Sequence, residues 1–241
     1  MRDYRVRGIV EVALCVALSA VLNMVAMRLP INIAGGSISL TMLPIAVLAL
    51  RRGALAGAVG GTVFGLLDLL MEPFILFPAQ VALDYPVPYL LFGTGVGLFS
   101  GIYNRAFTKT FSNKTTAGFK PPATAAAVTA DANEAATGTA PGGFAQNVGS
   151  DTSGNLGKGS LVIVAALLTG GILRYLIHVI SGVLFFAEYA GGENVWAYSL
   201  IYNLSYLGPS LLASLIGTLI ILPVLSQALP VHGKVRAQSQ A

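Results

Sequence analysis

The strongest constraint on this chain is a series of long apolar runs separated by short polar segments. Such runs recur about every 20 to 30 residues on both sides of a single polar interruption. Over the whole chain 55% of the residues are hydrophobic and only 10% are charged, so the chain has too few polar side chains to cover a soluble domain of its length. We therefore expect a single domain that lies in a lipid bilayer.

The apolar runs predict an all-α fold, an integral membrane bundle of six transmembrane helices. The expected helices lie near residues 8–27, 40–50, 53–70, 81–103, 161–186 and 196–225. The segment between the fourth and fifth runs is rich in Thr, Ala, Gly, Ser, Asn and Lys, and this composition is typical of disorder. We expect helices 1–4 in residues 1–105, a disordered cytoplasmic linker in 106–158, helices 5–6 in 159–228 and a polar cytoplasmic tail in 229–241.

The basic residues predict the orientation in the membrane. With both termini in the cytoplasm, all of the 14 basic residues except Arg28 and Arg174 fall on the cytoplasmic side, as the positive-inside rule requires. These residues form short patches between apolar runs, not a continuous polar face with interleaved aromatic residues, so nucleic acid is not an expected partner. We predict a multi-pass protein of the cell membrane with cytoplasmic N- and C-termini.

Small residues at intervals of four predict close contacts between helices. They form two sets in the third and fourth runs, Gly53, Gly57, Gly61 and Gly65, and Gly93, Gly97 and Gly101. Ala13 and Ala17 form a similar pair in the first run. Glycine and alanine at this spacing allow another helix to approach closely, so the alanine pair predicts a contact within this protein or with a partner.

Polar side chains from three expected helices should meet near the outer face of the membrane. Counting helix rise from the predicted ends places five of them at a similar depth, namely Asp84, Tyr85, His178, Tyr198 and Asn203. Phe74, Phe185, Phe186 and Trp196 can add aromatic faces. An apolar pocket with a few directed polar groups is typical of a small-molecule site, and these residue types suit a flat, polar, positively charged ligand.

Each of these residues also has a purely structural interpretation. Asp84 can lie at the headgroup level beside its helix start, and His178 can be a packing histidine whose hydrogen bonds are satisfied. Asn203 and Tyr198 can form interhelical hydrogen bonds or belong to the interfacial aromatic belt. Arg174 needs a partner at its depth, for which Asp84 and Asp68 are the candidates. Asp68 and Glu11 are expected near the membrane interfaces.

Several stretches resemble a known family, the thiamin-specific substrate-binding subunits (S-components, ThiT family) of energy-coupling factor (ECF) transporters. They are LRRGALAGAVGG, AQVALDYPVPYLLFG, RYLIHVISGVLFFAEYA and AYSLIYN, and with the first helix they cover nearly all of the chain except the linker. The resemblance implies a protein without catalytic activity that captures thiamin from outside. It also implies association with a transmembrane coupling subunit and two cytoplasmic ATPases.

The resemblance assigns roles to individual positions of this chain. It places an acidic pocket residue at Asp84, a histidine at His178, a tyrosine at Tyr198 and an asparagine at Asn203, and it places the partner contact at Ala13 and Ala17. Its stacking residue after helix five falls on Phe186, and an aromatic residue before helix four falls on Phe74. With Tyr85, the expected ligand-binding set is Phe74, Asp84, Tyr85, His178, Phe186, Tyr198 and Asn203, with no catalytic residue, metal or cofactor.

Other functions make different demands on the sequence. An S-component for another vitamin or a thiamin-related pyrimidine needs the same scaffold and a different pocket. A secondary transporter is disfavoured because no paired interrupted helices recur in two halves. An intramembrane hydrolase needs His178 to activate Ser181, three residues later on the same helix, and this spacing rarely gives that contact. A purely structural membrane protein would not be stabilised by a ligand.

Overall fold

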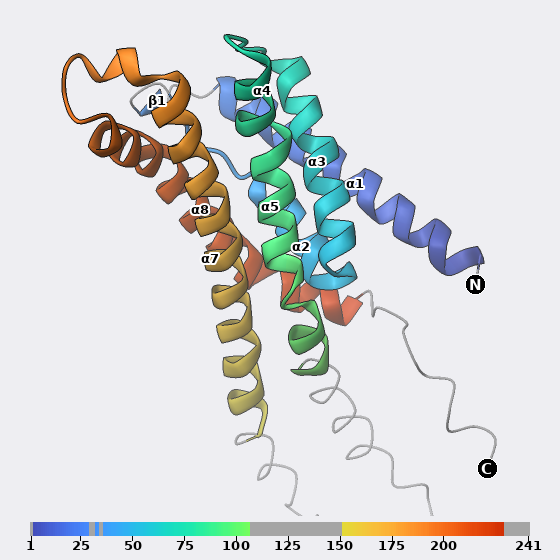
Figure 1. Cartoon of the computed structure of the whole chain (residues 1–241). Coiled ribbons are helices and arrows are strands. Elements are labelled where there is room, and N and C mark those ends of the chain that lie inside the picture. The colour runs from blue at the N-terminus through green and yellow to red at the C-terminus, as the bar shows by residue number, and fades with distance from the viewer. Residues whose placement is uncertain (1, 29–31, 34–35, 107–150, 229–241) are drawn as a thin grey trace, which may run out of the picture.

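The computed structural model describes residues 2–28, 32–33, 36–106 and 151–228, and these form a bundle of helices (Figure 1). The elements are α1 (Arg2–Arg28), α2 (Met42–Arg52), α3 (Ala54–Met71), α4 (Pro78–Asp84), α5 (Pro86–Gly97), α7 (Asp151–Phe185), the 3₁₀ helix η1 (Ala187–Ala190) and α8 (Val195–Ala228). Residues 100–106 are also helical. The predicted helical class is confirmed. One correction concerns the first loop, where β1 (Asn32–Ile33) and β2 (Gly36–Ser37) form a short antiparallel pair.

Four helices of the described part are long and apolar enough to cross a membrane. They are the segments Val6–Arg28, Ala54–Met71, Gly157–Phe185 and Val195–Ser226. The helices α2 and α5 have 11 and 12 residues, which at 1.5 Å per residue is about half to two thirds of the hydrocarbon thickness. The bundle therefore combines four long helices with shorter helical segments.

The expected fourth helix, residues 81–103, is broken. It consists of α4, α5 and the helical residues 100–106, with a break at Tyr85 (φ −112°, ψ −80°) and a turn at residues 98–99. Pro86 explains the first break, because a proline disfavours helical geometry in the residue before it and has no N–H to donate. The break places Asp84 and Tyr85 at the junction of two helices, next to the cavity described below.

The glycine spacing predicted a close approach by another helix, and the structure shows such a contact between α3 and α5. A Cβ atom added at Gly61 would lie 2.1 Å from the backbone oxygen of Tyr89, and one at Gly57 would lie 2.3 Å from that of Gly93. A side chain does not fit at such distances, so these glycines allow the two backbones to touch. Gly101 does not take part, because nothing lies within 4 Å of its Cβ position.

The short helix α2 occupies the centre of the bundle. Every residue from Met42 to Arg51 is buried, and α1, α3, α5 and α8 pack around the helix. At its C-terminal end Arg51 and Arg52 form ion pairs with Glu11 of α1, and the Arg51 Nε to Glu11 Oε1 distance is 2.6 Å. Glu11, expected near an interface, is thus one half of a partly buried charge cluster that links α1 to α2.

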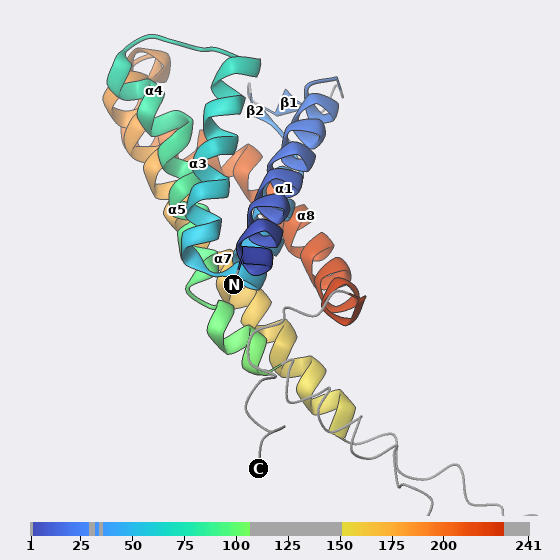
Figure 2. The same cartoon turned by 90° about the vertical axis from the view of Figure 1, so that its right-hand side faces the viewer.

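The two ends of the bundle differ. The helix α4 and the strand pair lie at one end, at the top of Figures 1 and 2, and residues 100–106 and the start of α7 lie at the opposite end. The helix α7 begins at Asp151 and not near residue 159, because an established helix elongates cheaply through polar residues. The rest of the expected linker, residues 107–150, and the tail, residues 229–241, lie outside the described residues.

Candidate functional site: a cavity at one end of the bundle

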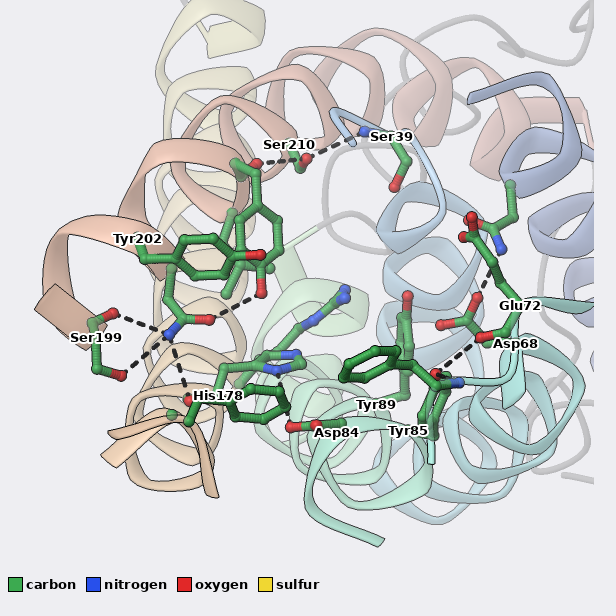
Figure 3. Close-up of a pocket in the computed structure, with 18 of the residues that line it drawn as sticks. Ser39, Asp68, Glu72, Asp84, Tyr85, Tyr89, His178, Ser199, Tyr202 and Ser210 are labelled. Carbon is green, nitrogen blue, oxygen red and sulfur yellow. Dashed lines mark hydrogen bonds and ion pairs between the residues drawn. The ribbon is translucent and has the colours of Figure 1, made fainter. Parts of the chain in front are cut away.

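A cavity of about 720 Å³ opens at the end of the bundle that carries α4 and the strand pair. Its walls come from the C-terminal ends of α1, α3 and α7, from the α4–α5 junction and from the first half of α8. In the close-up of Figure 3, Asp68 and Glu72 lie on one side, Tyr202 and Ser199 lie on the other, and His178 and Asp84 lie between them. Segments far apart in the sequence therefore meet around one space.

All seven residues of the expected ligand-binding set line this cavity, namely Phe74, Asp84, Tyr85, His178, Phe186, Tyr198 and Asn203. Helix rise and the predicted orientation had placed the polar members of this set at one depth. The structure brings them together in space. Their role in binding a ligand stays a prediction.

Asp84 and His178 form the polar centre of the cavity. The Asp84 Oδ2 atom accepts a hydrogen bond from Gln80 Nε2 at 2.5 Å, and Asp84 Oδ1 lies 3.9 Å from His178 Nδ1 (Figure 3). That distance is too long for a hydrogen bond. The other ring nitrogen, His178 Nε2, is buried and has no hydrogen-bond partner. A buried polar atom without a partner costs free energy.

Asn203 fits the structural interpretation as well as the functional one. Its Nδ2 donates to the Ser199 backbone oxygen at 2.9 Å and more weakly to the His178 backbone oxygen at 3.4 Å. Its Oδ1 accepts from the Tyr206 hydroxyl at 2.8 Å. These bonds connect α8 to α7 and orient Tyr206, so Asn203 is an interhelical hydrogen-bonding residue that also faces the cavity.

Two stacked aromatic pairs lie on the cavity wall. Phe74 stacks on Phe186 with ring centroids 6.0 Å apart and an interplanar angle of 19°, and Tyr198 stacks on Tyr202 at 5.9 Å and 21°. The other two aromatic candidates do not line the cavity. Phe185 packs against Phe77, and the Trp196 side chain, expected beside the pocket, is 57% exposed in the first turn of α8.

The Tyr85 hydroxyl forms hydrogen bonds with the backbone. It donates to the Glu72 carbonyl and accepts from the Phe74 N–H, both at 2.8 Å. Tyr85 therefore holds the connection between α3 and α4 against the cavity. Its ring can still contact a ligand, but its hydroxyl is engaged.

Arg174 does not form the ion pair expected with Asp84 or Asp68. Within the described residues no carboxylate lies within ion-pair distance of it, and its guanidinium carbon lies 3.9 Å from the centroid of the Tyr89 ring. Both candidate carboxylates have other donors, because Asn23 Nδ2 donates to Asp68 at 2.6 Å and Gln80 donates to Asp84. The guanidinium is instead placed over an aromatic face, which attracts cations.

Several cavity residues were missed from the sequence. Asp68 was assigned to the membrane interface but lines the cavity, as do Asn23, Tyr89, Tyr202 and Tyr206. The outer-end position of Asp68 on its helix was a usable signal, since it matched the depth of Asp84. The tyrosines carried no such signal, because aromatic residues near a membrane interface are common without any ligand.

The contact that a hydrolase requires is not formed. Ser181 Oγ is fully buried and has no hydrogen-bond partner, so it does not bond to His178. Among the residues with described positions, no group of three His, Cys, Asp or Glu side chains is placed to hold a metal ion.

The chain is similar to known proteins over most of its length. The chain is 29% identical over 206 residues to the thiamine transporter ThiT of Bacillus subtilis, covering 84% of this chain and 83% of the relative. It is 31% identical over 194 residues to the thiamine transporter ThiT of Lacticaseibacillus paracasei, covering 78% and 72%. A solved structure of ThiT from Listeria monocytogenes shares the fold, with a TM-score of 0.62 at 24% identity over 94% of this chain and 96% of that one. Residues 9–230 match the model of the family described as thiamine transporter protein, and this chain belongs to that family.

Proposed function

We propose that this protein binds thiamin in the cavity between α3, α4, α7 and α8 and delivers it for uptake as the S-component of an ECF transporter. The observation that carries the proposal is the cavity itself, in which Asp84, His178 and two stacked aromatic pairs meet in a member of the thiamine transporter family. The protein performs no chemistry on its ligand. Energy comes from ATP hydrolysis in separate subunits.

The charge of the cavity suits a cation. Of the residues that the structure describes, three carboxylates line it, those of Asp68, Glu72 and Asp84, against the single guanidinium of Arg174. A cleft that is lined mainly by one sign of charge concentrates ligands of the opposite sign. Thiamin carries a permanent positive charge on its thiazolium ring, which the carboxylates and the aromatic faces attract.

The remaining part of thiamin is a neutral aminopyrimidine with hydrogen-bond donors and acceptors. Asp84 can accept from its amino group, and His178 Nε2 is a buried ring nitrogen without a partner in the cavity wall. The stacked rings of Phe74 with Phe186 and Tyr198 with Tyr202 provide flat faces for the two heterocycles. Hydrogen bonds and stacking together select for a flat aromatic ligand.

The proposal includes six membrane crossings with cytoplasmic termini. The four long helices supply four crossings, and we assign the other two to α2 and to the broken path from α4 through residue 106. The positive-inside distribution supports this orientation, which places the cavity at the outer face. The capture site is then open to the medium from which the ligand comes.

We assign the contact with the coupling subunit to α1. Ala13 and Ala17 are both exposed on this helix, so the bundle itself does not use them for packing. Small residues on an exposed helix face allow close approach by a helix of another subunit. Substituting both by Leu should reduce copurification with the coupling subunit and leave thiamin binding unchanged.

Thiamin binding to the protein in detergent, measured by isothermal titration calorimetry, tests the proposal. Saturable binding should weaken at least about tenfold in Asp84→Ala and in His178→Ala, since each removes a hydrogen-bonding group from a largely buried site. Glu193→Ala is the matched control, because Glu193 is exposed and does not line the cavity. Riboflavin, biotin and an isolated aminopyrimidine should be titrated in parallel.

Each outcome separates the candidates. Preference for the aminopyrimidine over thiamin would favour the alternative, an S-component for a thiamin-related pyrimidine. Preference for riboflavin or biotin would assign a different vitamin. Absence of binding by all four compounds to folded protein would refute the proposed function.

A further inference from the structure

We propose that Gln80 is a positioning residue of the site, which holds the Asp84 carboxylate and the segment carrying Phe74 in a fixed relation. The proposal rests on the proposed thiamin binding. Gln80 was not part of the expected site and does not line the cavity. Its side chain is only 1% exposed on the side of α4 that faces the α3–α4 connection.

The amide of Gln80 is fully used. Its Oε1 accepts from the Leu76 N–H at 3.1 Å, and its Nε2 donates to the Phe74 carbonyl at 3.2 Å and to Asp84 Oδ2 at 2.5 Å. A glutamine amide has two N–H donors, and each has an acceptor here. One buried side chain therefore joins the helix α4 to the preceding backbone and to the cavity carboxylate.

The three partners determine which way the amide points. Leu76 offers an N–H and needs an acceptor, whereas the Phe74 carbonyl and the Asp84 carboxylate need donors. Only one orientation satisfies all three. A glutamate at this position would keep the bond from Leu76 but would direct its second oxygen at two other acceptors.

This arrangement matters because it connects the polar and the aromatic parts of the site. With Oδ2 held by Gln80, the Asp84 carboxylate keeps Oδ1 on the side of His178, 3.9 Å from its Nδ1. The same amide holds the backbone of Phe74, whose ring stacks on Phe186. A site that is preorganised in this way loses less free energy to ordering when the ligand binds.

The variants Gln80→Leu and Gln80→Glu test the proposal by thiamin calorimetry between pH 5.5 and pH 8. Gln80→Leu keeps the approximate size and removes all three bonds, so its affinity should fall about tenfold at every pH. Gln80→Glu should bind more weakly still at pH 8. At lower pH it should regain affinity, because two adjacent carboxyl groups then hold a proton between them and a donor to Asp84 returns.

The other titrating groups near Asp84 are present in the wild type and in both Gln80 variants. Among the described residues, the charged and titratable side chains that face it or line the same cavity are Asp68 of α3 and Glu72 just after it, Tyr85 at the α4–α5 junction, Tyr89 of α5, Arg174 and His178 of α7, Tyr189 of η1, and Tyr198, Tyr202 and Tyr206 of α8. These groups also titrate in the wild type, so each variant is compared with the wild type at every pH. Thr169→Val on α7 is the control, because it also keeps the approximate size of the side chain and removes a hydrogen bond, that to the Ala165 carbonyl, outside the cavity; it should bind like the wild type.

A double-mutant cycle with Asp84→Ala gives a second, independent measurement. If Gln80 acts partly through Asp84, the effect of Gln80→Leu should be smaller in the Asp84→Ala background. Unfolding temperatures without ligand show whether each variant is folded. The pH response of Gln80→Glu compares one variant with itself at different pH values, so it does not depend on a difference in folding between variants.

Several results would overturn the inference while leaving the proposed function intact. These are wild-type affinity in both Gln80 variants, the same pH profile in Gln80→Glu and Gln80→Leu, or an effect of Gln80→Leu that is unchanged when Asp84 is absent. Failure of the wild-type protein to bind thiamin would instead refute the proposed function.

Discussion

The cavity side chains are of two kinds. Some have polar atoms that already form hydrogen bonds within the protein, and others have polar atoms without a hydrogen-bond partner. The hydroxyl of Tyr85 and the amide of Asn203 are already hydrogen-bonded. His178 Nε2 is buried without a partner. We therefore expect His178 to contribute to ligand contact and Tyr85 to contribute chiefly to the shape of the site.

Tyr85→Phe separates these two roles. The substitution keeps the ring and removes the two hydrogen bonds to the Glu72 carbonyl and the Phe74 N–H, at a cost of about 1–3 kcal/mol for the groups left without a partner. The unfolding temperature should fall, and thiamin affinity should fall by several fold because the segment carrying Phe74 is released. Thermal unfolding and calorimetry provide the measurements.

Tyr175→Phe is the control for that experiment. The Tyr175 hydroxyl donates to the Leu200 carbonyl at 3.0 Å in an exposed position outside the cavity. Water can replace an exposed hydrogen bond, so this variant should keep its affinity. An equal loss in both variants would mean that Tyr85 has no special role at the site.

The ion pairs at the C-terminal end of α2 give a second prediction for a single residue. Glu11→Gln removes the negative charge that faces Arg51 and Arg52. Taking one partner out of a partly buried ion pair should destabilise the protein by about 1–3 kcal/mol. The unfolding temperature should fall while thiamin affinity stays unchanged, since Glu11 does not line the cavity. A loss of affinity without a loss of stability would contradict this interpretation.

Among the elements, the contact between α3 and α5 positions one whole side of the site. The two backbones touch at Gly57, Gly61 and Gly65, and the last of these faces the Tyr85 carbonyl. Asp68 lies near the C-terminal end of α3, and the α4–α5 junction carries Asp84 and Tyr85. The separation of these residues across the cavity therefore depends on how closely the two helices approach.

Gly61→Ala tests this dependence. A Cβ atom at Gly61 would lie 2.1 Å from the Tyr89 backbone oxygen, so the helices must move apart, which costs about 1–3 kcal/mol by the usual effect of overpacking. We expect a lower unfolding temperature and weaker thiamin binding. In Gly8→Ala, where nothing lies within 4 Å of the new atom, neither quantity should decrease. Unchanged behaviour of Gly61→Ala would disprove the close contact.

For the whole molecule, the orientation in the membrane decides which side the cavity serves. The chain has a single cysteine, Cys15, so a Cys15→Ala background accepts single reporter cysteines. In intact cells, a membrane-impermeant maleimide should label Glu193→Cys near the cavity end. It should label Lys158→Cys near the start of α7 only after the membrane is broken. Labelling of Lys158→Cys in intact cells would reverse the proposed orientation.

The sequence by itself determined the membrane class, the helical fold, a close helix contact through glycines and seven of the residues that line the cavity. Apolar length, helix rise and residue spacing are local properties, and a bilayer allows few ways to satisfy a backbone. Only the tertiary structure decided which polar atoms are already engaged, such as Gln80 with Asp84, Tyr85 with Glu72 and Arg174 with Tyr89. These pairings depend on side-chain directions at helix breaks and crossings, which residue spacing does not specify. The position of Trp196 outside the cavity follows from the same limit, whereas the break at Tyr85 is explained by a local signal, Pro86.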